Sequence, residues 1–130
     1  MQNMEYIVET EKPFEQAAAD LAAAVSRNQF GVLHVHDLQA TLKSKGFDFP
    51  NACRIFEVCN PKQAQAVLSR DMSLNMALPC RISVYEDNGT TRIGMISPKA
   101  MLSTLSGSAE LTQIAEEVET VTRRIIDEAR

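Results

Sequence analysis

The segment RISVYEDNGTTRIGMI, residues 81–96, is the stretch that decides the fold. It contains two β-forming runs, 81–85 and 92–96, on either side of Asp87-Asn88-Gly89. Asn-Gly strongly favours a two-residue hairpin turn, because both residues tolerate positive φ. The segment therefore predicts two neighbouring antiparallel strands.

The rest of the chain alternates between strand and helix patterns. Further strands are predicted around 6–8, 32–36 and 54–58. Asp37 and Asn60 are good N-cap residues, and Pro13 and Pro61 suit the first position of a helix. These signals predict helices over 13–28, after Asp37 and after Asn60, with a short helical turn after Ser97. Residues 71–79 are expected to be irregular.

A long C-terminal helix is predicted to start near Ser108. Its apolar face is formed by residues at helical spacing: Leu111, Ile114, Ala115, Val118, Val121, Thr122 and Ile125. Together the patterns predict an α+β fold with a mostly antiparallel five-stranded sheet covered on one face by helices. A small parallel α/β sheet is the competing interpretation, and the Asn-Gly hairpin argues against it. With 130 residues, no repeat and no linker, residues 1–130 are expected to form a single domain.

Composition limits the classes of partner. The net charge of -4 and the pI of about 5.2 argue against nucleic acid, which requires a clustered basic surface. No apolar run approaches the roughly 20 residues that span a bilayer, so no membrane partner is expected. The N-terminus lacks the pattern of a signal peptide, and the odd number of cysteines, 3, is typical of reduced thiols. We therefore expect a cytoplasmic location.

Two short strings suggest a site: Cys59-Asn60-Pro61 and Leu78-Pro79-Cys80. Each places a cysteine where a predicted strand meets a proline-marked turn. A helix N-terminus lowers the pKa of a nearby thiol, so Cys59 is predicted to favour the thiolate. If the two strands are neighbours, a dithiol, a persulfide carrier or a two-sulfur metal site becomes possible. The alternative is that both cysteines are apolar packing residues.

The case for a metal or cofactor is weaker. His34 and His36 lie on one face of a predicted strand and could form half of a metal site. The alternative is that they belong to the solvated face of an amphipathic strand. Cys53 falls on the same strand face as Cys59, but no Cys-x-x-Cys spacing exists. We expect neither a metal nor a cofactor.

Several motifs occur in a characteristic order: Phe30-Gly31-Val32-Leu33, Asp37-Leu38-Gln39-Ala40-Thr41-Leu42, Cys59-Asn60-Pro61-Lys62-Gln63-Ala64, Leu78-Pro79-Cys80 and Pro98. In this order the chain, over roughly 14–101, resembles the domain-of-unknown-function 302 family. The resemblance implies a compact α+β domain similar to one half of the TATA-binding-protein fold, usually a homodimer, with no established reaction. On the family pattern, the residues matching a possible site are Asp37, Thr41, Cys59, Asn60, Pro61, Pro79 and Cys80.

Three functions follow as hypotheses. The first is a homodimeric, non-catalytic binding or accessory protein whose small-molecule pocket is lined by Asp37, Thr41, Cys59 and Cys80. The second is a thiol-based redox enzyme or sulfur carrier, with Cys59 as nucleophile and Cys80 as the neighbouring thiol. The third is a purely structural dimer. The sequence leaves open whether the protein is an enzyme.

Overall fold

A five-stranded antiparallel sheet forms the centre of the structure, a computed structural model that describes residues 4–130. The strands lie in the order β1-β5-β4-β3-β2, and each neighbouring pair is antiparallel. The elements, in chain order, are β1 (Glu5–Thr10), α1 (Phe14–Arg27), β2 (Gly31–Asp37), α2 (Leu38–Ser44), β3 (Cys53–Cys59), α3 (Pro61–Arg70), the 3-10 helix η1 (Met72–Ala77), β4 (Cys80–Asp87), β5 (Thr90–Ile96), α4 (Pro98–Leu105) and α5 (Ala109–Ala129). This arrangement confirms the predicted α+β class.

The hairpin that joins β4 to β5 has the predicted turn. Asn88 and Gly89 both have positive φ, 52° and 78°, and Asp87 pairs directly with Thr90. This is the backbone that an Asn-Gly pair adopts most readily. The turn therefore fixes the register of the central strands.

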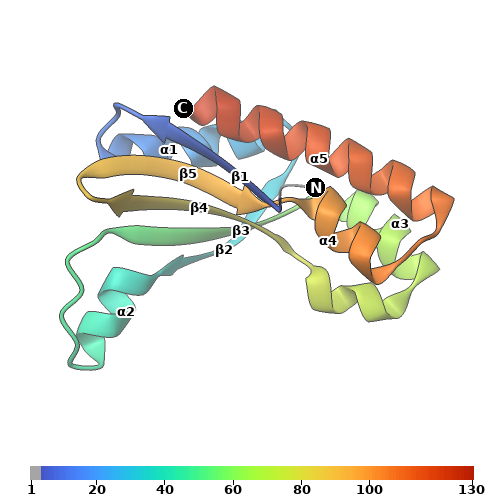
Figure 1. The fold of residues 1–130 in the computed structure, drawn as a ribbon, viewed down its shortest axis with the longest axis horizontal. Helices are drawn as coiled ribbons and strands as arrows, with labels where there is room; N and C mark the ends of the chain where they lie inside the picture. The colour runs from blue at the N-terminus through green and yellow to red at the C-terminus, as the bar shows by residue number, and fades with distance from the viewer. Residues whose placement is uncertain (1–3) are drawn as a thin grey trace.

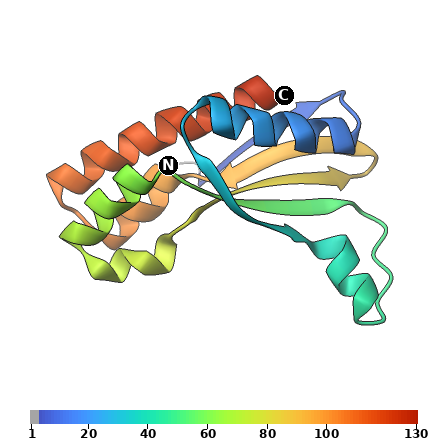
Figure 2. The ribbon, with the colours of Figure 1, turned by 180° about the vertical axis from the view of Figure 1, so that it is seen from behind.

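Helices α1 and α5 lie side by side over one face of the sheet, as Figures 1 and 2 show from opposite sides. Their apolar stripes pack onto the alternate residues of the strands that face them. The largest fully buried side chains between these layers are Leu21, Val25, Val58, Ile82, Val84, Ile93, Ile125 and Ile126. The long C-terminal helix is thus a principal part of the core, as predicted.

The remaining helices lie at the two ends of the sheet (Figure 1). Helix α2 follows β2 at one end, and α3, η1 and α4 gather at the other. This second group has its own small cluster of buried residues with the first half of α5: Val67, Leu74, Leu102, Leu111 and Ala115. The described part of the chain therefore has two apolar clusters, and α5 contributes residues to both.

Residues 71–79 are more regular than predicted. Met72–Ala77 form a 3-10 helix, because the Asp71 side chain accepts hydrogen bonds from the backbone N–H of Ser73 at 3.0 Å and from its hydroxyl at 2.6 Å. The helix buries Leu74 completely. Within residues 4–130, no helix combines the length and apolar character needed to cross a membrane.

Candidate functional site

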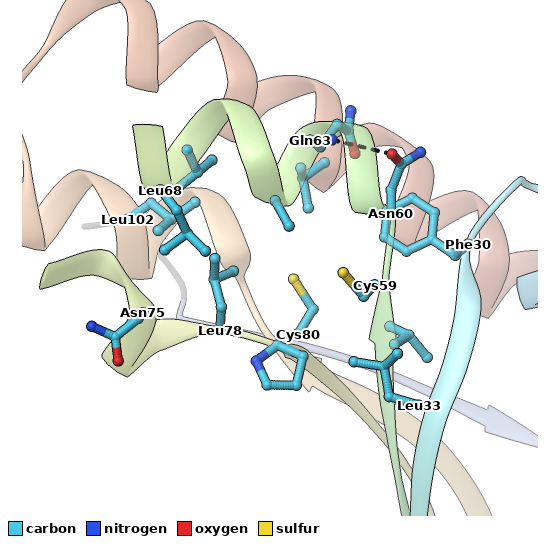
Figure 3. Close-up of a pocket in the computed structure, with 15 residues that line it drawn as sticks. Phe30, Leu33, Cys59, Asn60, Gln63, Leu68, Asn75, Leu78, Cys80 and Leu102 are labelled. Atoms are coloured by element: carbon cyan, nitrogen blue, oxygen red, sulfur yellow. Dashed lines mark hydrogen bonds between the residues drawn. The ribbon is translucent and has the colours of Figure 1, made fainter. Parts of the chain in front are cut away.

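A cavity of about 270 Å³ lies between α3 and the end of the sheet where β3 stops and β4 begins (Figure 3). Among the residues that the structure describes, none that lines it is charged. The walls are formed by apolar side chains, two thiols and three amides: Phe30, Leu33, Val58, Ala64, Val67, Leu68, Leu78, Pro79, Leu102 and Val118, then Cys59 and Cys80, then Asn60, Gln63 and Asn75. Such a surface is suited to binding an uncharged, mainly apolar molecule.

The two cysteines singled out in the sequence meet in this cavity. Val58 of β3 pairs with Cys80 of β4, so Cys59 is only one residue beyond the paired position. Both thiols are free, and both sulfur atoms point into the cavity (Figure 3). Pro79 lines the same cavity, and its peptide bond with Leu78 is cis. The structure thus brings Cys59, Pro79 and Cys80 together at one end of the sheet.

The predicted activation of Cys59 is wrong. Burial raises the pKa of the Cys59 thiol above its ordinary value. Burial also raises the pKa of Cys80, to about 11, with smaller contributions from Cys59 and Glu119. Removing a thiol from water disfavours its charged form, and this burial is the cause of the upward shift at Cys59. Both sulfurs are therefore neutral thiols near neutral pH.

The start of α3 offers Cys59 few free backbone donors. The Asn60 side chain accepts a hydrogen bond from the backbone N–H of Gln63 at 3.2 Å, and the Asn60 carbonyl accepts one from the Ala64 N–H at 2.9 Å. Pro61, exposed at the first helical position, has no N–H. Of the N–H groups in the first turn that have no acceptor within the helix, Pro61 thus lacks one and that of Gln63 is used by the Asn60 side chain. Asn60 lines the cavity, whereas Pro61 does not.

Strand β2 contributes one wall through an irregularity. Val32 pairs with Val58 and His34 pairs with Glu57, so Leu33 is the extra residue of a β-bulge. A bulge disturbs the strict alternation of side chains and re-aims the one that is inserted. Leu33 consequently lines the cavity, although 61% of its surface stays exposed.

Asp37 and Thr41 do not lie at this cavity, so the predicted pocket is wrong about these two residues. Antiparallel pairing places Gly31 beside Cys59 and Asp37 beside Arg54, at opposite ends of β2. A strand of this length spans about 20 Å. The Asp37 carboxylate instead accepts a hydrogen bond from the Ala40 N–H at 2.9 Å and lies 3.6 Å from Arg54 Nε. Thr41 follows on α2, at that far end.

The histidines lie apart from the cavity lining as well. The His34 and His36 rings are 4.5 Å apart, centroid to centroid, and His36 Nε2 is 3.4 Å from Glu57 Oε2. In the region 4–130, no three histidine, cysteine or acidic side chains are grouped so that they could hold a metal ion. Cys53 is at the far end of β3 from Cys59, and burial, with a smaller contribution from Asp37, raises its pKa.

Comparison with known proteins agrees with this architecture. The family model described as "Domain of unknown function DUF302" matches residues 6–129. The chain belongs to the DUF302 family. A solved DUF302 structure, an uncharacterized conserved protein from Bacillus stearothermophilus, is 33% identical to it with a TM-score of 0.90, over 98% of each chain. No curated protein matches the chain.

Several residues that line this DUF302 cavity were not predicted from the sequence. One face of α3 lines the cavity through Gln63, Ala64, Val67 and Leu68. Their spacing of three or four residues places them on the same side of the helix, and this spacing is visible in the sequence. Leu102 and Val118 come from α4 and α5. Only the packing of those distant helices against α3 brings them there, and no local pattern indicates it.

Proposed function

We propose that this DUF302 protein is a non-catalytic binding protein that holds a small, mainly apolar molecule in the cavity beside Cys59 and Cys80. The observation that carries the proposal is the composition of the lining: within residues 4–130 it is apolar apart from two thiols and three amides, and it contains no charge. A few polar groups in an apolar concavity are characteristic of small-molecule sites. The absence of a charged group from the lining favours binding over acid–base chemistry.

The cysteines support binding better than thiol chemistry. A redox enzyme or sulfur carrier needs a thiolate, and the pKa values of Cys59 and Cys80 are shifted upward, away from neutrality. As neutral thiols they act as small polarisable apolar groups. In the proposed function they are walls of the binding site. The three free cysteines also support the proposed cytoplasmic location.

The proposed assembly is a homodimer formed at the open edge of β2. This strand is the last in the sheet order, and Val32, Leu33 and Val35 on it are exposed. An edge strand with exposed apolar side chains offers unpaired backbone groups to another strand. A second copy of β2 pairing there would also cover Leu33, which belongs to the cavity wall.

Ligand binding is tested by filling the cavity. Ala64→Leu adds three carbon atoms to the cavity wall, whereas Gln65→Leu changes an exposed residue of the same helix that is not part of the lining. Binding of small apolar probes such as hexanol, followed by NMR titration, should weaken at least about tenfold in Ala64→Leu, a loss of about 1.4 kcal/mol. Gln65→Leu should bind like the wild type. Failure of the wild type to bind any apolar probe would contradict the proposal.

The dimer is tested by placing a charge on the edge. Val35→Lys should dissociate it, because lysine on an edge strand blocks strand pairing. Ile7→Lys replaces an exposed apolar residue on β1, at the opposite edge, and should leave the dimer intact. Light scattering of both variants and the wild type measures the result. A monomeric wild type, or equal dissociation of both variants, would overturn this interface.

A further inference from the structure

Cys59 and Cys80 are close enough for one atom to bridge their sulfurs. Val58 lies opposite Cys80 in the sheet, so Cys59 is one residue farther along β3. Opposed Cα atoms lie about 5 Å apart and each residue advances about 3.4 Å, which gives a diagonal of about 6 Å, within the span of linked cysteines. Cys59 ends β3, where the chain turns into α3, and its sulfur points into the same cavity as that of Cys80 (Figure 3). The two residues therefore form a dithiol.

This dithiol is accessible from the cavity. Both cysteines line it, and neither is fully buried. The other lining residues are mainly apolar, and the volume is about 270 Å³. An engineered apolar cavity of about 150 Å³ in another protein binds benzene. The space beside the two sulfurs is therefore large enough for the organic part of a reagent, up to the size of an aromatic ring.

The surroundings of the dithiol are unsuited to a metal cation. Structural zinc takes four ligands, and in the described part of the chain no three histidine, cysteine or acidic side chains are grouped to hold a metal. A soft monovalent ion such as Cu(I) accepts two thiolates, but the complex keeps a negative charge, and no cationic side chain among residues 4–130 lines the cavity to pair with it. Any cation must also displace the thiol protons, and burial raises the pKa of both thiols.

Trivalent arsenic with one carbon substituent R matches the site in valence. Two of its three bonds exchange with thiols, and Cys53, the third cysteine, lies about 20 Å away at the far end of β3. In the hydrated form RAs(OH)₂, each As–O bond is replaced by an As–S bond, and each hydroxyl leaves with a thiol proton as water. Arsenic stays trivalent, so nothing is oxidised or reduced. The product carries no charge.

We propose that Cys59 and Cys80 together capture uncharged, monosubstituted arsenic(III) compounds, whose carbon substituent lies in the apolar cavity. The proposal rests on the binding function proposed above, because the same cavity holds the substituent. Inorganic arsenite fits the site less well. After two thiols have bound, it keeps a hydroxyl on arsenic, and a polar group in apolar surroundings is disfavoured unless it finds a hydrogen-bond partner.

Phenylarsine oxide is the probe for capture. One equivalent should lower the number of free thiols by two, from three to one, and intact-mass spectrometry should show a single bridged adduct. Peptide mapping of the wild-type adduct should place arsenic on Cys59 and Cys80. Cys59→Ala should weaken capture at least about a hundredfold, because the second, intramolecular bond is lost. Cys53→Ala should capture like the wild type, and circular dichroism establishes that both variants are folded.

The position of the substituent is tested by comparing phenylarsine oxide with methylarsine oxide. Both affinities are measured by competition with ethanedithiol, which cancels the intrinsic difference between the reagents. The wild type should prefer the phenyl compound at least about tenfold, because the ring removes more apolar surface from water. Ala64→Leu, which fills the cavity, should lose most of this preference. Gln65→Leu, at an exposed position of α3, should keep it.

The outcomes separate this proposal from the proposed function. Bridging of Cys59 and Cys80, with a phenyl preference that Ala64→Leu removes, supports the capture. Binding of hexanol by a wild type that phenylarsine oxide does not bridge overturns the capture and leaves the binding function standing. An equal phenyl preference in wild type and Ala64→Leu also overturns it, because the substituent then lies outside the cavity. If neither hexanol nor phenylarsine oxide binds, both proposals fail.

Discussion

The buried carboxylate of Glu119 accepts a hydrogen bond from the Ser97 hydroxyl at 2.7 Å, which ties α5 to the start of α4. The same oxygen, Oε1, accepts a bond from the Lys99 N–H at 3.2 Å, and Oε2 accepts one from Arg123 Nε at 2.8 Å. Ser97 in turn caps α4 by accepting a bond from the Ala100 N–H at 3.1 Å. One acidic side chain thus holds the helix pair that borders the cavity.

Glu119→Gln should destabilise the fold. The amide oxygen can still accept from Ser97 and Lys99, but the NH₂ group then faces the Arg123 donor. We expect the free energy of unfolding in urea to fall by about 1–3 kcal/mol, the range for a hydrogen bond to a charged group. Glu117→Gln, on the exposed side of α5, should change it by less than about 0.5 kcal/mol. Equal effects would show that the Ser97–Glu119 contact contributes nothing specific.

The contribution of Glu119 should depend on pH. Burial by itself would raise the pKa of Glu119, but the hydrogen bonds from Ser97, Arg123 and the Lys99 N–H lower it below the ordinary value. A lowered folded-state pKa stabilises the protein above about 4.3, the unfolded value, and this stability is lost as the pH falls through the folded value. The stability difference between wild type and Glu119→Gln, measured by urea unfolding, should therefore shrink in acid. A constant difference would contradict this account.

Gly94→Ala should also destabilise the protein. A Cβ atom at Gly94 in β5 would lie 2.9 Å from Ile7 Cγ1 and 3.2 Å from the Tyr6 carbonyl oxygen, so β1 would have to move. We expect a loss of about 1–3 kcal/mol in the free energy of unfolding, as for other overpacked sites. Gly31→Ala is the control, because its Cβ would approach only the Cys59 carbonyl oxygen, at 4.0 Å. A similar loss in both variants would show that the close contacts at Gly94 are not its cause.

Cys80 should make the protein sensitive to alkali. Its pKa is about 11 in the folded state, raised by burial, by Cys59 and by Glu119, whereas an unfolded thiol ionises at about 8.5. A raised folded-state pKa means full stability below the unfolded value and a progressive loss as the pH rises through the folded value. The free energy of unfolding should fall over this pH range. Cys80→Ala should make this decrease with pH smaller. Alkylation of native Cys80 at neutral pH that is as fast as in the unfolded chain would contradict the shift.

Local signals in the sequence predicted the elements well, because each depends on a few neighbouring residues. Asn88 and Gly89 form the turn with positive φ at both positions, and Asn60 bonds to the Gln63 N–H as a cap should. Asp37 caps α2 in the same way through Ala40. The C-terminal stripe is buried as the helical period requires. These features were sufficient to establish the α+β class.

The site was predicted only in part, because its composition depends on contacts between distant segments. The pairing of β2 with β3 decides that Asp37 lies far from Cys59, and the bulge decides that Leu33 lines the cavity. The pKa of Cys59 follows from how deeply the fold buries it, whereas the sequence showed only its position before a helix. Strand register and burial are properties of the assembled chain.

The cavity lies where the two apolar clusters of the molecule approach each other: Val58 belongs to the larger one, and Val67 and Leu102 belong to the smaller one. Regions with a separate small core can open locally at a lower free energy than global unfolding. A molecule bound in the cavity would contact both clusters and couple their opening. Amide protons of α3 and α4 should then exchange with solvent more slowly when a molecule is bound in the cavity. Binding would thus make the smaller cluster open together with the larger one, so that the domain unfolds more cooperatively.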